Sequence, residues 1–92
     1  MKLAAALLCV LFIAACTPKT AEEQIAEAKR LVLEGERNAA IVELNNAVVT
    51  EPNNANARFQ LGKLEYQQGL WEESEKELRR SLELGYDKLQ AY

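Results

Sequence analysis

The pattern of hydrophobic and polar positions divides the chain into an apolar leader and a longer, mixed segment. Leu3 to Ala15 form an uninterrupted apolar run behind the basic Lys2. A transmembrane helix needs about 20 such residues, so this run is too short to span a membrane. It has the length and the basic start of a signal peptide, which we expect over residues 1–15.

The mixed segment predicts four helices and no strand. After residue 20 the chain is rich in Ala, Leu, Glu, Lys, Arg and Gln, all of which favour helix. Thr20 is followed three positions later by Glu23, the spacing of a capping box, and Asn54 is a suitable N-cap for a later helix. Pro52 ends one helix, and Gly85 ends the last. We expect an all-α fold with helices over 21–34, 38–51, 55–68 and 72–84.

These helices fall into two units of equal length. When 21–54 is written above 55–88, Gly35 falls over Gly69, small residues align with small, and large with large. In this register the following residues coincide: Ala28 with Gly62, Ala40 with Ser74, Leu44 with Leu78, and Ala47 with Ser81. A fixed period of this length is the signature of a repeat architecture.

The repeated unit resembles the tetratricopeptide repeat (TPR), whose period is about 34 residues. The residues that carry the resemblance are the small and turn-forming ones: Ala28, Gly35, Ala40, Ala47 and Pro52 in unit 1, and Gly62, Gly69, Ser74 and Ser81 in unit 2. The resemblance covers residues 21–88 and implies an α-solenoid fragment of about two helix-turn-helix units. Small side chains at these positions let paired helices approach closely, and Gly35 adopts the left-handed conformation that ends a helix.

Several residues depart from the family pattern. Gln24 and Arg58 stand where a large apolar residue is usual, Glu27 replaces Leu, and Glu65 occupies another large position. The first helix of unit 1 is therefore expected to pack loosely. Trp71 stands where the family commonly has an aromatic residue that packs between units, so it is expected in the core.

The ends of the chain carry two further expectations. The segment Leu89-Gln90-Ala91-Tyr92 matches the opening of another first helix, so residues 89–92 are expected to begin a third unit of a longer array. Ile13-Ala14-Ala15-Cys16 resembles the lipobox of bacterial lipoproteins. That resemblance implies cleavage before Cys16, a diacylglyceryl group on its thiol, and a short tether over 16–20; Thr17 favours the outer over the inner membrane. The alternatives are an ordinary cleaved signal peptide with an incidental cysteine, or an uncleaved anchor.

Composition argues against several classes of function. The net charge is −3 with no basic stripe, so nucleic acid is not an expected partner. The chain has no His, and its only cysteines are Cys9 and Cys16, of which Cys9 would leave with the leader. These residues cannot assemble a Cys/His metal site or a nucleophile–His pair. We therefore expect no metal, no cofactor and no enzymatic activity.

The resemblance implies a concave groove lined by the first helix of each unit. The family uses equivalent positions there, which in this chain are Ile25, Lys29, Val32, Phe59, Lys63 and Tyr66, with Glu22, Leu33, Asn56 and Gln67 beside them. Two lysines flanked by apolar residues would suit an extended or helical peptide with a negative group. Alternatively, Lys29 and Lys63 are merely solvated. The carboxylate clamp of the chaperone-binding subclass is not expected, because Ile25 and Lys29 occupy its positions.

Together these features predict a membrane-anchored scaffold that binds proteins or peptides on the periplasmic side of a bacterial cell envelope. More weakly, the chain resembles the TPR lipoproteins of exosortase (PEP-CTERM) systems, which implies a role in exopolysaccharide assembly or protein sorting. Two alternatives remain: the binding module of an enzyme whose catalytic domain lies beyond Tyr92, and a structural spacer.

Overall fold

Four helices make up the part of the protein that the computed structural model describes, residues 17–86. They are α2 (Ala21–Leu33), α3 (Arg37–Thr50), α4 (Ala55–Gln67) and α5 (Trp71–Glu83), and residues 17–86 contain no strand. Every helix begins and ends within one residue of its expected bounds, and the all-α fold is confirmed. The predicted signal peptide, Cys16 and the start of a third unit at 89–92 lie outside the described residues.

Side-chain caps and glycines determine where the helices begin and end. The Thr20 hydroxyl accepts a hydrogen bond of 3.2 Å from the backbone N–H of Glu23, and the Asn54 side chain accepts one of 2.9 Å from Ala57. These bonds satisfy N–H groups that have no partner within the helix. Gly35 and Gly69 follow α2 and α4 with φ of 81° and 78°, a conformation that other residues adopt only at a cost.

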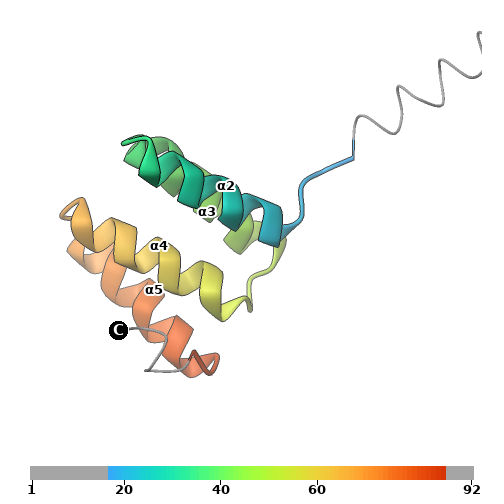
Figure 1. Ribbon diagram of the computed structural model, residues 1–92. Helices are drawn as coiled ribbons and strands as arrows, with labels where there is room; N and C mark the ends of the chain where they lie inside the picture. The colour runs from blue at the N-terminus through green and yellow to red at the C-terminus, as the bar shows by residue number, and fades with distance from the viewer. Residues whose placement is uncertain (1–16, 87–92) are drawn as a thin grey trace, which may run out of the picture.

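The helices form two antiparallel hairpins that lie side by side. α2 pairs with α3 and α4 pairs with α5, and the hairpins meet mainly where α3 packs against α4. Figure 1 shows α2 and α4 on the near face of the molecule, with α3 and α5 behind them. The two first helices of the repeat therefore share one face. Among residues 17–86, no helix is long and apolar enough to cross a membrane.

The core is built largely of small side chains. Its apolar part comprises Ala21, Ile25, Ala28, Ala40, Leu44, Ala47, Ala57, Leu61 and Leu64. Ser74 and Ser81 are buried as well, at positions where unit 1 has Ala40 and Ala47. Alanine and serine keep the helix axes close, so the interior can be filled without many large residues.

α4 and α5 approach each other closely at Gly62. A Cβ atom on this residue would lie 2.8 Å from Cγ of Leu78 and 3.1 Å from its backbone nitrogen. The Ser74 hydroxyl also donates a hydrogen bond of 2.7 Å to the Gly62 carbonyl oxygen. The small residues at 62 and 74 thus meet across the hairpin.

Two expectations about packing are wrong. The first helix does not pack loosely, since Ala21, Ile25 and Ala28 of α2 are buried, and the Thr50 hydroxyl donates a 3.0 Å hydrogen bond to the Gln24 side chain. Trp71 is not in the core: it is 61% exposed. Its indole lies edge-on to Tyr66 at a ring distance of 4.9 Å, because the first residue of α5 projects along the outer side of its own hairpin.

Candidate functional site

A groove of about 450 Å³ lies between α2 and α4, the two helices on the shared face. Its apolar part is formed by Ile25, Ala28 and Leu44 from the first hairpin and Leu64 from the second. The full lining adds the residues along its edges: Lys29, Val32, Leu33, Gln60, Lys63 and Gln67. The groove therefore joins both hairpins, and its shape depends on how they pack.

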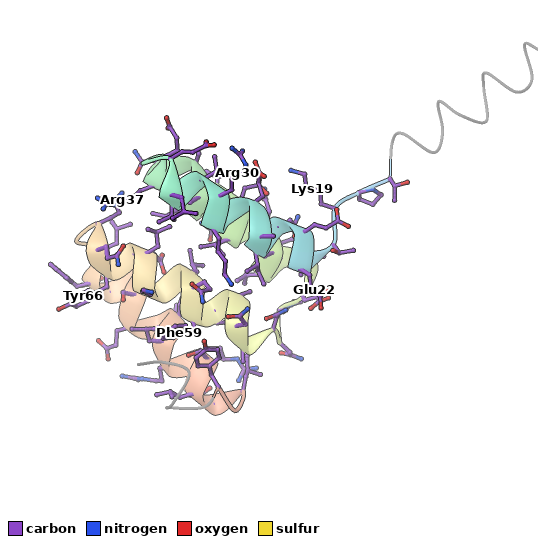
Figure 2. The ribbon with its side chains drawn as sticks, viewed as in Figure 1. Lys19, Glu22, Arg30, Arg37, Phe59 and Tyr66 are labelled. Carbon is purple, nitrogen blue, oxygen red and sulfur yellow. The ribbon has the colours of Figure 1, made fainter. Side chains whose placement is uncertain are left out.

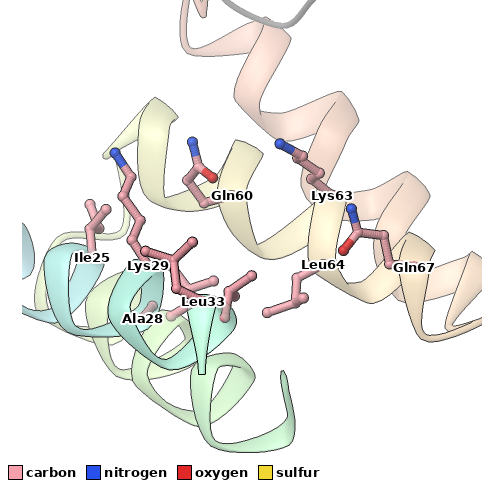
Figure 3. A pocket seen from close by; sticks show the side chains of 10 residues that line it. Ile25, Ala28, Lys29, Leu33, Gln60, Lys63, Leu64 and Gln67 are labelled. Carbon is pink, nitrogen blue, oxygen red and sulfur yellow. The ribbon is translucent and has the colours of Figure 1, made fainter. Parts of the chain in front are cut away.

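Lys29 and Lys63 border this groove from opposite helices. Figure 3 shows the polar ends of Lys29, Gln60 and Lys63 on one side of the groove, with Leu33 and Leu64 beneath them. No carboxylate is among the lining residues. Within residues 17–86, neither lysine forms an ion pair, whereas Arg30, Arg58, Arg79 and Arg80 all do. Two exposed positive charges thus stand beside an apolar surface without a balancing negative charge.

The position of each lysine follows from helix geometry. Lys29 lies four positions after Ile25, so the two side chains share a face of α2, and Ile25 is buried while Lys29 reaches solvent. Lys63 follows Gly62, which faces α5, so Lys63 is turned out of the α4–α5 contact. A long, flexible stem lets each ammonium group reach water while its methylene groups line the groove.

Residues 28–69 match the family model described as TPR repeat. Over these residues the chain is similar to the TPR repeat family. The match extends from Ala28 in α2 to Gly69 after α4, so it includes both walls of the groove. A search of the curated proteins finds no match. TPR repeats are protein–protein interaction modules and typically have no catalytic role.

The structure divides the predicted groove residues of the TPR units into two groups. Ile25, Lys29, Val32 and Lys63 line the groove between α2 and α4. Phe59 and Tyr66 do not line it; they lie with Lys63, Gln67 and Leu78 around a second hollow of about 320 Å³. In Figure 2, Phe59 projects from α4 on the side away from α2, which explains the separation. Ile25 is only 5% exposed and contributes to the floor.

Comparison by repeat position missed two groove residues, Gln60 and Leu64. Repeat register selects the same positions from each first helix, and a groove between two helices is lined by different faces of them. Lys29 and Leu33 of α2 and their equivalents Lys63 and Gln67 of α4 all line the groove, and α4 adds Gln60 and Leu64, which have no lining counterparts in α2. The signal that could have identified them is their helical spacing, since Gln60 lies three positions before Lys63 and Leu64 lies three positions before Gln67.

A buried carboxylate lies on the other side of α4. Glu65 is 6% exposed, and its Oε1 has no hydrogen-bond partner among the described residues. Burial, and then the negative charges of Glu77 and Glu73, raise the pKa of Glu65 to about 7, while Lys76 acts in the opposite direction. Unit 1 has Leu31 at this position. No group of His, Cys, Asp and Glu within residues 17–86 could hold a metal ion.

Proposed function

We propose that this chain is a lipid-tethered scaffold whose TPR groove binds a partner protein through a segment that carries an acidic group beside an apolar side chain. The observation that carries this proposal is the pair Lys29 and Lys63, which lack ion partners within residues 17–86 and border an apolar groove without carboxylates. Such a surface offers positive charge to attract an anion and an apolar area against which a hydrophobic side chain of the partner can be buried.

Charge supports an acidic ligand. The chain as a whole has a net charge of −3, so two unbalanced lysines are a local exception. A partner carboxylate between them would gain electrostatic attraction from both helices, and the attraction would raise the association rate. The apolar floor, with Ile25, Ala28 and Leu64, would contribute affinity through burial of a hydrophobic side chain.

The groove can be tested with two matched peptides. One alternates Leu and Glu, and the other has Lys in place of each Glu. Titration of each into the isotope-labelled protein, followed by amide chemical shifts, should show binding of the acidic peptide at Leu44, Leu64 and their neighbours, and no binding of the basic one. The affinity should fall as salt is added, because the ion pairs are exposed.

Substitutions test the two lysines directly. Lys29→Ala and Lys63→Ala should each weaken binding of the acidic peptide by about fivefold, close to 1 kcal/mol for an exposed ion pair. Lys76→Ala is the matched control, because Lys76 is an exposed lysine of α5 outside the groove. Equal binding of both peptides, or equal effects of all three substitutions, contradicts the proposal.

The tether is proposed from the leader and Cys16. Lys2, the apolar run and Ile13-Ala14-Ala15-Cys16 support a lipid on the Cys16 thiol, and Thr17 after it favours the outer membrane. The short segment 17–20 would then hold the groove close to the periplasmic surface of the bacterial envelope. There the scaffold would recruit proteins of exopolysaccharide assembly or protein sorting.

Lipidation is tested in cells by incorporation of labelled palmitate. The wild-type protein and Cys9→Ala, which keeps Cys16, should take up the label and enter the membrane fraction. Cys16→Ala should not take up the label, and the inhibitor globomycin should leave an uncleaved precursor of the wild type. Label in Cys16→Ala at the wild-type level contradicts a lipid at this residue.

A further inference from the structure

The outer side of α3 carries a stripe of residues without charge. Asn38, Val42, Asn45 and Val49 follow the spacing i, i+4, i+7 and i+11, which places them on one face of the helix. We call this set of four residues the α3 stripe. All four are exposed, and the two valines are 58% and 79% exposed. The stripe lies opposite to the buried side of α3, which packs against α2 and α4.

The stacking of the repeats does not use this side of the helix. One repeat later, α5 has Glu72, Lys76, Arg79 and Glu83, and all of them are exposed. The second hairpin therefore leaves the α3 stripe uncovered, and the first hairpin leaves the equivalent stripe of α5 uncovered. A neighbouring unit packs elsewhere in both directions along the array, so the α3 stripe is not the place where another repeat docks.

The two stripes occupy equivalent places and differ in chemistry. Every residue of the α5 stripe is charged, as is usual for the side of a helix that faces water. The α3 stripe consists of two valines and two asparagines. α3 is thus uncharged on its outer side and apolar on its buried side. Helices with this character are typically covered by protein on both sides.

A second copy of this chain fits the α3 stripe better than a charged partner does. Where two parallel helices pack about a two-fold axis, each residue meets the same residue of the other copy. A charged residue there would face an identical charge, which is repulsive. The α3 stripe avoids this repulsion, and it offers an acidic or a basic partner no opposite charge.

Asparagine is also suited to meeting its own copy. Its amide group is both donor and acceptor, so two such groups can bond to each other across a two-fold axis. The Asn45 Nδ2 donates a hydrogen bond of 3.0 Å to the carbonyl oxygen of Ile41 in its own helix. This bond uses one of the two N–H groups of Nδ2 and orients the side chain. The second N–H group can donate to Asn45 of the other copy.

We propose that two copies of this chain associate through the α3 stripe, with their α3 helices side by side and parallel. The parallel arrangement also suits the tether proposed above, because it brings the N-terminal segments of both copies to the same end of the pair. The inference from the stripe itself depends neither on the tether nor on what the groove binds.

The contact is small, and the dimer is therefore weak in solution. α3 has 14 residues, which makes it about 21 Å long. One helix from each copy buries less than the roughly 1,200 Å² at which stable interfaces begin. We expect a dissociation constant on the order of 100 μM. Figure 1 shows α2 and α4 on the face away from α3, so the grooves of both copies stay open and the pair can bind a partner at two points.

Sedimentation equilibrium tests the dimer between roughly 10 μM and 1 mM chain. The full chain is kept in a mild detergent, which covers the apolar run from Leu3 to Ala15. Val49→Glu should weaken the dimer by at least about tenfold, because it places two carboxylates side by side. The matched control is Leu82→Glu, since Leu82 is 52% exposed on α5, outside the stripe, and this variant should dimerise like the wild type.

An equimolar mixture of the Val49→Glu and Val49→Lys proteins tests the parallel arrangement. Each variant alone should be monomeric, since identical charges meet. In the mixture a carboxylate meets an ammonium group, and dimers should return with a dissociation constant within about tenfold of the wild-type value. Circular dichroism establishes that both variants keep the wild-type helix content, so that loss of the dimer reports on the stripe.

Four outcomes overturn the proposal. They are a monomer at every concentration, a dimer that Val49→Glu leaves unchanged, a dimer that Leu82→Glu abolishes, and a mixture of the two variants at Val49 that stays monomeric. Binding of the acidic peptide to the groove should be equal for Val49→Glu and the wild type. Failure of the dimer and failure of the groove are therefore separate results.

Discussion

The hydroxyl of Ser74 donates a hydrogen bond of 2.7 Å to the carbonyl oxygen of Gly62, which joins α5 to α4. Both residues are buried, and Leu78 occupies the space where a Cβ atom of residue 62 would lie. Unit 1 has Ala28 and Ala40 at the equivalent positions. The second hairpin thus combines a smaller residue on one helix with a polar one on the other.

The first prediction concerns the space at Gly62. Gly62→Leu should lower the free energy of unfolding by about 1–3 kcal/mol, since even a Cβ would lie 2.8 Å from Leu78 Cγ. For a domain of this size the melting temperature should fall by roughly 5–15 °C. Thermal unfolding followed by circular dichroism measures the change. Ala26→Leu, at an exposed position of α2, is the control and should have little effect.

The second prediction compares the hydroxyl groups of Ser74 and Ser81, of which the first bonds to another helix and the second to its own helix. Ser74→Ala should cost about 1 kcal/mol, because its hydrogen bond links two helices. Ser81→Ala should be close to neutral. The Ser81 hydroxyl donates to Leu78 in its own helix, and alanine has the higher helix propensity. Chemical unfolding of both variants gives the comparison, and equal losses would show that the link between helices has no special value.

The third prediction concerns the dependence of stability on pH. The pKa of Glu65 is raised from its ordinary 4.5 to about 7 by burial and by Glu77 and Glu73, so the folded protein holds this proton more tightly than the unfolded chain does. The protonated Glu65 therefore stabilises the folded protein fully below about pH 4.5. This stabilisation is lost as the pH rises through 7, and the free energy of unfolding falls by up to about 3 kcal/mol.

Glu65→Gln should remove most of this slope and make the protein more stable than wild type at pH 8. Urea unfolding at several values between pH 5 and pH 8 measures it. Glu36→Gln, at an exposed carboxylate, is the control and should retain the wild-type slope. A wild-type stability that rises over this interval would show that Glu65 is not the dominant titrating group.

The fourth prediction concerns the ion pair between Arg58 and Glu77. Its atoms are 2.8 Å apart, and the two side chains are 16% and 9% exposed. Arg58→Met should cost about 3 kcal/mol, because it leaves a buried carboxylate without a partner. The double substitution Arg58→Met with Glu77→Leu should recover most of that loss.

The exposed pair of Arg79 and Glu75 provides the comparison. Both side chains are 68% exposed, and Arg79→Met should change stability by less than about 1 kcal/mol. A double-mutant cycle at each pair measures the coupling energies. If the double variant at 58 and 77 is no more stable than Arg58→Met alone, the loss does not come from the unpaired Glu77.

Local signals in the sequence determined the helices and their order. Thr20 and Asn54 cap the helices they precede, and Gly35 and Gly69 end α2 and α4, because each of these roles depends only on neighbouring backbone groups. The register of the repeat predicted which residues occupy equivalent places, since a repeated unit folds the same way each time. These signals predict helix bounds within one residue.

Only the tertiary structure decided what surrounds each of those places. Leu44 and Leu78 are equivalent in sequence, and Leu44 is covered by α4 while Leu78 borders an open hollow. For the same reason Trp71 is exposed, Phe59 and Tyr66 lie apart from the groove of Lys29, and Gln60 joins that groove. Whether a residue is buried depends on which helix packs against its own. The position of a residue within its repeat does not specify which face the neighbouring helix turns toward it.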